Sequence, residues 1–440
     1  MIAIDSAQRL HERDLTLFCR AILLSFTPIQ TVCSGCVAPS IAEVFQAMAH
    51  ITPHRVALFT HSTQPRGGVV YALDLAEALT DLGHDVTVHA PDATGNGFFR
   101  EVRCHVRLVP APPVRGSVAD VHRSRIAAYI DFLEMHAPEF DIYHAQDGIS
   151  ANALAVLVAR GVIPAFVRTV HHLDDLEDPY LVACQDRSIV SARRCLCVSR
   201  LWQRKLRQTY GVEASVVPTG VNPARFSPNR SEADEAWRTR LGLGHGPVFL
   251  ALGGIEPRKN TVKTLQAFLS IRQTLPHAQL VIAGGVSMLD HSGYRQQFEA
   301  VLATADEQSR RAVILAGTLP DGAMPSLFRL ADALVFPSAK EGFGLAVLEA
   351  MACGTPVIAS AMPPFIEYLD RSDALLIDPH DVSAIAGAMT WVTDPSVYDH
   401  LRAAGLSLSS RFSWDASAKA HLAHYDEIQA PTGTAMLAAR

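Results

Sequence analysis

The sequence predicts an α/β protein made of two doubly wound domains. From residue 55 onward, short apolar segments of strand length alternate with amphipathic segments of helical length, which is the pattern of a parallel sheet covered by helices on both faces. The alternation stops at a Pro- and Asn-rich segment, residues 218–235, and then starts again. The length of 440 residues also exceeds what one hydrophobic core usually serves. We therefore expect two domains joined by a hinge.

The first series contains seven apolar segments that we predict to be strands. A helix is predicted over 67–82, where Val70, Leu73 and Leu79 lie near helical spacing and Gly83 supplies a stop signal. The predicted strands lie at 55–60, 85–90, 106–110, 141–145, 165–170, 194–198 and 214–218.

The second series repeats this pattern with six apolar segments. Its predicted strands lie at 247–254, 278–285, 312–317, 332–338, 355–360 and 374–378. The expected organisation is an N-terminal extension at 1–53, which is disordered or a start-site artefact ahead of Met48, a first domain at 54–222, a second domain at 223–412, a helix at 413–430 that packs back on the first domain, and a tail at 431–440. Doubly wound domains bind ligands at the carboxyl ends of their strands, so we expect the site in a cleft between the domains.

Composition favours small-molecule chemistry in the cytoplasm. The net charge of −6 gives no general attraction to nucleic acid or to an anionic membrane. The eight cysteines are spaced irregularly, as in a protein of a reducing compartment, and the Cys33–Cys36 pair lacks the second ligand pair of a zinc site. The apolar run at 21–26 is too short to span a bilayer, and Glu12 and Asp14 ahead of it argue against a signal peptide.

Two glutamates stand eight positions apart after the fourth strand of the second series. Glu341 opens the run EGFGLAVLE and Glu349 closes it. Gly342 and Gly344 allow close approach to the backbone, and a helix that begins near Leu345 presents free N–H groups to a phosphate. Glu349, two turns into that helix, can accept hydrogen bonds from vicinal hydroxyls. The alternative is that both are surface helix-cap charges.

A pair of cations follows the first strand of the second series. Arg258 and Lys259, in the run GGIEPRKN, can neutralise a diphosphate. Fixed positive charges of this kind lower the barrier of a reaction in which negative charge develops on a departing group. The alternative is a solvated pair, although cations at the start of a helix are unfavourable without an anion.

These two motifs together resemble the family-4 retaining glycosyltransferases, which have the two-domain GT-B fold. The resemblance covers residues 55–425 and is greatest to a bacterial subgroup with TVHHLDD and GGIEPRKN. It implies a hexosyltransferase-like enzyme that uses a nucleoside-diphosphate sugar, with no metal, no cofactor and no protein nucleophile. The acceptor would be a carbohydrate, a lipid or a small molecule, and nucleic acid would not be a partner.

The resemblance also implies roles for particular residues. Lys259 would neutralise the diphosphate, Glu349 would hold the donor ribose and Glu341 would lie beside the donor sugar. The family's usual Arg falls at Gly253 or Gly254 here, which leaves Arg258 as the stand-in. The implied catalytic residues are Lys259, Glu341, Arg258 and His171, and the implied donor-binding residues are Gly67, Gly68, Phe343, Gly344, Leu345, Glu349 and Leu319, with the base against the turn that contains Leu319.

The first domain contributes a glycine loop and a group of polar residues. Gly67 and Gly68 stand between the first strand and its helix, where backbone amides meet a phosphate, although a plain turn is the alternative. His171 matches the family's T-x-H, whereas Gln146 stands where the family commonly has a sugar-contacting His, with His144 two residues earlier. An isolated histidine is more often structural. Metal binding by the HHLDD run is not expected.

Three other readings compete with an enzyme of this kind. A catalytically silent nucleotide-sugar sensor is the main one, because the family's Arg is missing. A nicotinamide-dependent oxidoreductase would need a G-x-G-x-x-G at the first strand, which is absent, and a phosphorylase is usually a much longer chain. The basic run from Arg187 to Arg207 is a candidate for contact with a membrane surface, but a solvated helical face is the favoured interpretation.

Overall fold

The computed structural model describes residues 53–136, 140–285 and 291–429. The N-terminal extension up to residue 52, with the Cys33–Cys36 pair and Met48, therefore lies outside the described residues, as does the tail at 431–440. None of the helices in the described ranges has the length and apolar character that crossing a bilayer requires.

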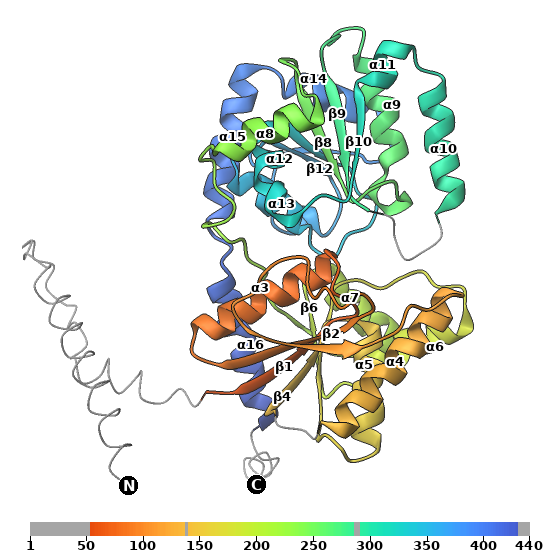
Figure 1. Cartoon of the computed structure of the whole chain (residues 1–440). Coiled ribbons are helices and arrows are strands. Elements are labelled where there is room, and N and C mark those ends of the chain that lie inside the picture. Colours follow the sequence, from red (N-terminus) through yellow and green to blue (C-terminus); the bar gives the residue numbers. More distant parts are fainter. Residues whose placement is uncertain (1–52, 137–139, 286–290, 430–440) are drawn as a thin grey trace, which may run out of the picture. The chain divides into compact units, whose positions relative to one another are not determined.

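A seven-stranded parallel sheet forms the first half of the fold (Figure 1). Its strand order is β3-β2-β1-β4-β5-β6-β7, and every predicted strand of the first series is confirmed. The strands are β1 (Arg55–Phe59), β2 (Asp85–Asp92), β3 (His105–Pro110), β4 (Ile142–Ala145), β5 (Val167–Val170), β6 (Arg194–Cys197) and β7 (Ser215–Val216). The helices between them are α3 (Gly67–Asp81), α4 (Val118–Met135), α5 (Gly148–Ala159), α6 (Pro179–Val190) and α7 (Arg200–Tyr210). We call this half, together with the C-terminal helix, the first lobe.

A six-stranded parallel sheet forms the second lobe, in the order β10-β9-β8-β11-β12-β13. Its strands are β8 (Val248–Leu252), β9 (Gln279–Ala283), β10 (Val313–Gly317), β11 (Ala333–Phe336), β12 (Val357–Ser360) and β13 (Leu375–Ile377). Its helices are α8 (Glu232–Leu241), α9 (Thr261–Ile271), α10 (Ser292–Ala303), α11 (Glu307–Arg311), α12 (Met324–Leu330), α13 (Leu345–Ala352), α14 (Val382–Trp391) and α15 (Pro395–Ser409), with short 3-10 turns η1 (Pro257–Lys259), η2 (Asp321–Ala323) and η3 (Phe365–Glu367). Both lobes are therefore doubly wound, as predicted.

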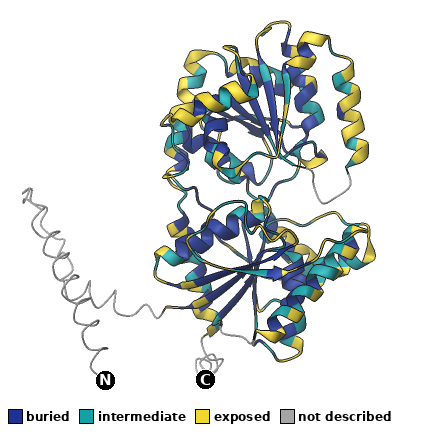
Figure 2. Cartoon of the chain, in the orientation of Figure 1, coloured by how far each residue is buried: buried dark blue, intermediate teal, exposed yellow. Residues whose placement is uncertain are grey.

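Each sheet is buried on both faces, so the described part of the chain has four apolar layers (Figure 2). In β1, Val56 and Leu58 face one layer while Ala57 and Phe59 face the other, because successive strand residues point to opposite sides. Strands buried in this way appear in the sequence as continuous apolar runs, which is why they could be predicted.

The chain crosses between the lobes twice, at neighbouring positions. In the outgoing segment, the Val221 N–H donates a hydrogen bond to the carbonyl oxygen of Phe412 in the return segment, at 3.1 Å. The two segments form an isolated β-bridge at Val221. A Cβ on Gly220 would lie 2.3 Å from the backbone nitrogen of Trp414, so only glycine fits between the two crossings. The return segment leads into α16 (Trp414–Gln429), which packs against α3 in the first lobe.

Each sheet has one point at which its strand order reverses. In each sheet the order reverses beside the first strand, between β1 and β4 and between β8 and β11. Ligands of doubly wound sheets bind outside the carboxyl ends of the strands at such reversals. The loops after these four strands are therefore where a site is expected.

Candidate active site

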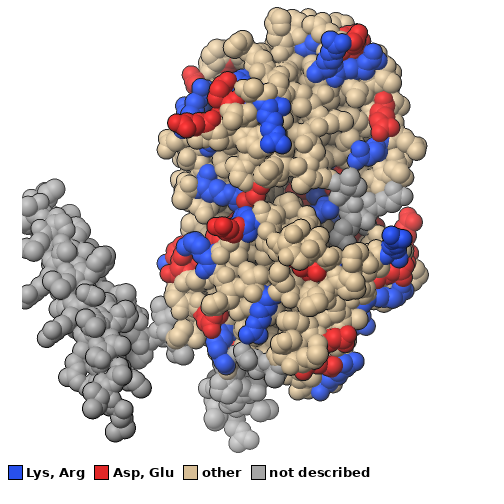
Figure 3. Space-filling model, viewed as in Figure 1, with Lys and Arg blue, Asp and Glu red and all other residues tan. Residues whose placement is uncertain are grey.

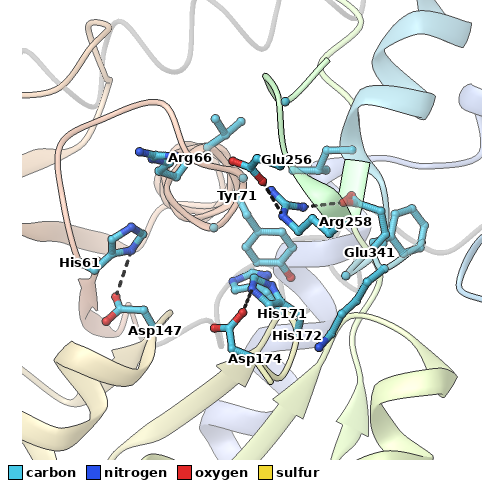
Figure 4. A pocket seen from close by; sticks show the side chains of 18 of the residues that line it. His61, Arg66, Tyr71, Asp147, His171, His172, Asp174, Glu256, Arg258 and Glu341 are labelled. Carbon is cyan, nitrogen blue, oxygen red and sulfur yellow. Dashed lines mark hydrogen bonds and ion pairs between the residues drawn. The ribbon is translucent and has the colours of Figure 1, made fainter. Parts of the chain in front are cut away.

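A cavity of about 710 Å³ lies between the carboxyl ends of the two sheets (Figure 4). Loops from both lobes line it, including those after β1, β5, β8 and β11. It brings together every residue that the sequence singled out for catalysis or donor binding: Gly67, Gly68, His171, Arg258, Lys259, Leu319, Glu341, Phe343, Gly344, Leu345 and Glu349.

One carboxylate oxygen joins the two cations of the second lobe. Lys259 Nζ lies 2.7 Å and Arg258 Nη1 lies 2.8 Å from the same atom, Glu341 Oε1. Burial raises the pKa of Glu341, but the charges of Lys259 and Arg258 outweigh this effect and hold that pKa below its usual value. Burial lowers the pKa of Lys259, while Glu341 opposes the shift. We conclude that Lys259 and Glu341 form a buried ion pair at neutral pH. The Arg258 side chain, which is 42% exposed, lies at the solvent-facing edge of this pair.

The glycines after β8 determine where these cations lie. Gly253 and Gly254 both have positive φ, at 112° and 75°. A Cβ on Gly253 would lie 2.6 Å from Lys259 Cε, and a Cβ on Gly254 would lie 2.6 Å from the carbonyl oxygen of Gly285. The loop thus folds tightly over the Lys259 side chain and leaves no space for a side chain at either glycine.

Helix α13 presents its N-terminus and Glu349 to the cavity. Gly344 caps the helix with a φ of 100°, and a Cβ there would lie 2.7 Å from the Phe365 ring. The preceding Phe343 ring stacks on Tyr368 with 4.4 Å between centroids, and the Tyr368 hydroxyl donates to the Phe343 carbonyl at 3.1 Å. These contacts fix the turn from which the α13 backbone amides face the cavity.

Glu349 is a half-buried carboxyl with an unusual pKa. Burial raises the pKa of Glu349 to about 8, against the attraction of Arg225 and with added repulsion from Asp74 and Asp321. Without a ligand this carboxyl is therefore largely protonated at neutral pH. A hydroxyl-bearing ligand that donates hydrogen bonds to it would favour the ionised form.

The first lobe contributes the start of α3 and the end of β5. Gly67 and Gly68 form the first turn of α3, and a Cβ on Gly68 would lie 3.4 Å from the ring of His171. The Tyr71 ring meets the His171 ring edge-on, with 4.8 Å between the ring centroids. Figure 4 shows both side chains at the cavity. Burial lowers the pKa of His171 well below its usual value, so the ring is neutral.

Some polar residues of the first lobe do not line the cavity. His144 and Gln146 lie behind His171 and are almost fully buried. His172 and Asp174 line the cavity but pair with each other at 3.3 Å, and Asp175 pairs with Lys340 of the second lobe at 2.7 Å. The HHLDD aspartates thus have protein partners.

The basic run at 187–207 is partly neutralised by carboxylates. Arg194 pairs with Glu427, Arg204 with Glu367 and Arg207 with Glu213. Figure 3 shows positive and negative side chains interspersed over the viewed face. Three cations of the run thus have carboxylate partners.

Two residues that the sequence analysis did not single out are prominent in the structure. Arg225, in the predicted linker, lines the cavity and forms an ion pair with Asp321. Trp202, on α7, donates its indole N–H to the carbonyl of Glu341 at 3.0 Å and so links the two lobes. Neither has a local signal: Arg225 stands in a polar segment, and Trp202 has the spacing of an ordinary core residue.

Comparison with known proteins finds a glycosyltransferase family model for each half of the chain. The model described as glycosyl transferases group 1 matches residues 234–405, and the model described as glycosyltransferase family 4 matches residues 65–225. A D-inositol 3-phosphate glycosyltransferase of Acidothermus cellulolyticus is 30% identical over 87% of this chain and 92% of its own length. The enzyme of that name from Mycolicibacterium vanbaalenii is 29% identical over 85% of this chain and 90% of its own length.

Solved structures show the same fold at lower identity. Sucrose-phosphate synthase from Thermosynechococcus elongatus superposes with a TM-score of 0.72 at 22% identity, over 85% of this chain and 98% of its own. HepE of Anabaena, solved in complex with UDP-glucose, gives a TM-score of 0.68 at 17% identity, over 85% of this chain and all of its own. This chain belongs to the group 1, family-4 glycosyltransferases and is a glycosyltransferase of the two-domain GT-B fold.

Proposed function

We propose that this protein transfers a sugar from a nucleoside-diphosphate sugar to a hydroxyl-bearing acceptor with retention of the anomeric configuration. The observation that supports this most is the shared contact of Lys259 and Arg258 with Glu341 Oε1 inside the cavity. Two preorganised cations at the carboxyl end of a doubly wound sheet suit a diphosphate, and they stabilise the negative charge that develops as it leaves. On this proposal the cations meet that charge without a bound metal ion.

The donor would lie along the second lobe. Glu349 would accept hydrogen bonds from the ribose hydroxyls, and the base would lie against the turn at Leu319. The backbone amides of Phe343, Gly344 and Leu345 would face the phosphate or the sugar, which the N-terminus of α13 favours. The amides of Gly67 and Gly68, at the start of α3, would approach the donor from the first lobe.

Glu341 is proposed as an electrostatic partner and not as a nucleophile. Its Oε1 already accepts from two cations, and a retaining glycosidase would need two free carboxylates roughly 5 Å apart. The acceptor hydroxyl would attack from the face that the diphosphate leaves, and a donor phosphate oxygen would take its proton. His171 would contact the sugar.

The relatives indicate which donor and which acceptor to test first. The Anabaena relative was solved with UDP-glucose, so UDP-sugars head the list of donors, and the two curated relatives are named for D-inositol 3-phosphate, so a phosphorylated polyol heads the list of acceptors. A cytoplasmic location is proposed because the five cysteines of the described residues are free thiols.

A nucleotide-sugar sensor is the second candidate. It is favoured by the absence of the family's Arg, which would fall at Gly253 or Gly254. A Cβ would lie 2.6 Å from Lys259 Cε at the first position and 2.6 Å from the Gly285 carbonyl oxygen at the second. A sensor and an enzyme would bind the same donor, but only the enzyme would turn it over.

The test is nucleoside diphosphate release from UDP-, GDP-, ADP- and dTDP-sugars, with and without D-inositol 3-phosphate. The protein is compared with Lys259→Ala and Glu349→Ala, and Lys419→Ala on the exposed side of α16 serves as the control. Release from one donor that both site variants abolish supports the proposal. Thermal stabilisation by one nucleotide without release from any donor supports the sensor. Absence of both signals contradicts the assignment of this cavity.

A further inference from the structure

A hydrogen-bonded chain of buried side chains connects the C-terminal helix to His171. The Tyr425 hydroxyl lies 2.7 Å from His144 Nδ1, and His144 Nε2 lies 3.2 Å from Gln146 Nε2. Gln146 Oε1 then lies 3.1 Å from His171 Nε2. Thr169 Oγ1 also contacts His144 Nε2, at 2.8 Å. The chain thus runs from α16 through the ends of β4 and β5 to the wall of the cavity.

Only the last member of this chain reaches the cavity. His144 and Tyr425 are completely buried, and Gln146 is 3% exposed. A buried polar group that loses its partner costs free energy, so the orientation of the Gln146 amide and the proton positions on both imidazoles depend on one another. Among the described residues, His171 Nδ1 has no hydrogen-bond partner, so this nitrogen is left for a ligand.

The His171 ring is also held in place from its other sides. Tyr71 of α3 meets the ring edge-on, and the backbone of Gly68 lies against it. Trp414 of α16 in turn packs edge-on against Tyr71 at 5.0 Å. With the ring plane fixed by packing, the proton position on its two nitrogens is the variable that remains.

We propose that Gln146 is a positioning residue that holds His171 in a single tautomer, in which Nε2–H donates to Gln146 Oε1 and unprotonated Nδ1 accepts from a substrate hydroxyl. His144 and Tyr425 keep the Gln146 amide in the required orientation, because the amide N–H donates to His144 Nε2. The assignment of this hydroxyl to the transferred sugar rests on the proposed function. The assignment of the His171 tautomer does not depend on it.

The direct test is NMR of the full chain labelled with ¹³C and ¹⁵N in histidine, with the His171 signals assigned by their loss in His171→Gln. The ring shifts distinguish the two neutral tautomers. We expect the Nε2–H tautomer in the unmodified protein and a mixture in Gln146→Leu. In Gln146→Glu, whose carboxylate oxygen accepts at the same length, the Nε2–H tautomer should persist. The same His171 tautomer in the unmodified protein and in Gln146→Leu, or the Nδ1–H tautomer in the unmodified protein, would overturn the proposal.

Kinetics separate positioning from a general structural role. Gln146→Leu should lower kcat/KM about tenfold, with most of the loss in kcat, and Gln146→Glu should restore part of it. The Kd of the free nucleoside diphosphate, which lies against the second lobe, should change less than twofold. A parallel loss of nucleotide affinity and thermal stability would show that Gln146 only supports the fold. If the unmodified protein shows no transfer with any donor, the proposed function fails, and the NMR result still decides the role of Gln146.

Discussion

A Cβ atom on Gly342 would lie 2.5 Å from the carbonyl oxygen of His171. The turn that carries Glu341 in the second lobe therefore rests on the backbone at the end of β5 in the first lobe. Any side chain at this position would have to push the two loops apart. The spacing between the lobes across the cavity thus depends on the absence of one methyl group.

Gly342→Ala should reduce sugar transfer by at least tenfold, because the turn must shift away from His171. Overpacking of this kind typically costs about 1–3 kcal/mol of stability. The measurement is steady-state transfer together with thermal unfolding. Gly387→Ala on α14 is the matched control, since a Cβ there meets no atom within 4 Å. Equal activity of the two variants would contradict the proposed importance of this contact.

Trp202→Phe should weaken the link between the lobes. The change removes the indole N–H that donates to the Glu341 carbonyl and leaves that buried oxygen without this donor, a loss of about 1–3 kcal/mol. We expect a lower free energy of unfolding and slower transfer, measured by denaturant titration and by assay. Trp237→Phe on α8, a half-buried Trp remote from the cavity lining, controls for the loss of an indole and should leave transfer intact.

Arg258→Leu should lower kcat/KM for the donor by roughly 100-fold, as the loss of a preorganised donor to a developing charge does. An Arg introduced at Gly254, one of the two positions where the family's Arg would fall, should not restore activity. The φ of 75° and the 2.6 Å approach to the Gly285 carbonyl exclude a side chain there without strain. Kinetics of both single variants and the double variant check this, with exposed Arg295→Leu as the control. Recovery in the double variant would show that the loop adapts to the family's arrangement.

Stability should fall with rising pH because of Glu349. Its pKa in the folded protein is about 8, above the ordinary value of 4.5, so the folded state retains a proton that the unfolded chain releases. The free energy of unfolding therefore decreases as the pH rises through this window. Asp74, whose pKa burial raises to about 7, adds a slope of the same sign.

Comparison with Glu349→Gln isolates the contribution of this one group. Denaturant titrations at pH 5, 6, 7 and 8 should show a smaller decrease in the variant, since the amide does not titrate. An identical decrease in both proteins would mean that Glu349 has an ordinary pKa.

The strands and the glycine-rich turns could be predicted because they have local signatures. The run that became β12 is apolar throughout, as burial on both faces requires, and Gly344 stands where the backbone needs a positive φ. The run EGFGLAVLE likewise places Glu341 in the loop after β11 and Glu349 on α13, because both positions follow from one strand, one turn and one helix.

Long-range side-chain contacts had no such signature. Arg225 stands in a segment with the composition of a linker, and its ion pair with Asp321 depends on how the second lobe folds around it. The Trp202 indole finds its partner in a backbone carbonyl, which any residue at position 341 would supply. The chain from Tyr425 to His171 joins elements that are far apart in sequence, so periodicity could not reveal it.

The return of α16 to the first lobe has a consequence for the order in which the protein folds. Trp414, Ala418 and Tyr425 belong to the same apolar layer as Val56 and Leu58 of β1, so one wall of the first core is made of the last residues of the described chain. On the ribosome, the second lobe is synthesised in full before that wall emerges. The first lobe therefore lacks this part of its core until the second lobe has been synthesised. The lobe that is made first is the one that is completed last.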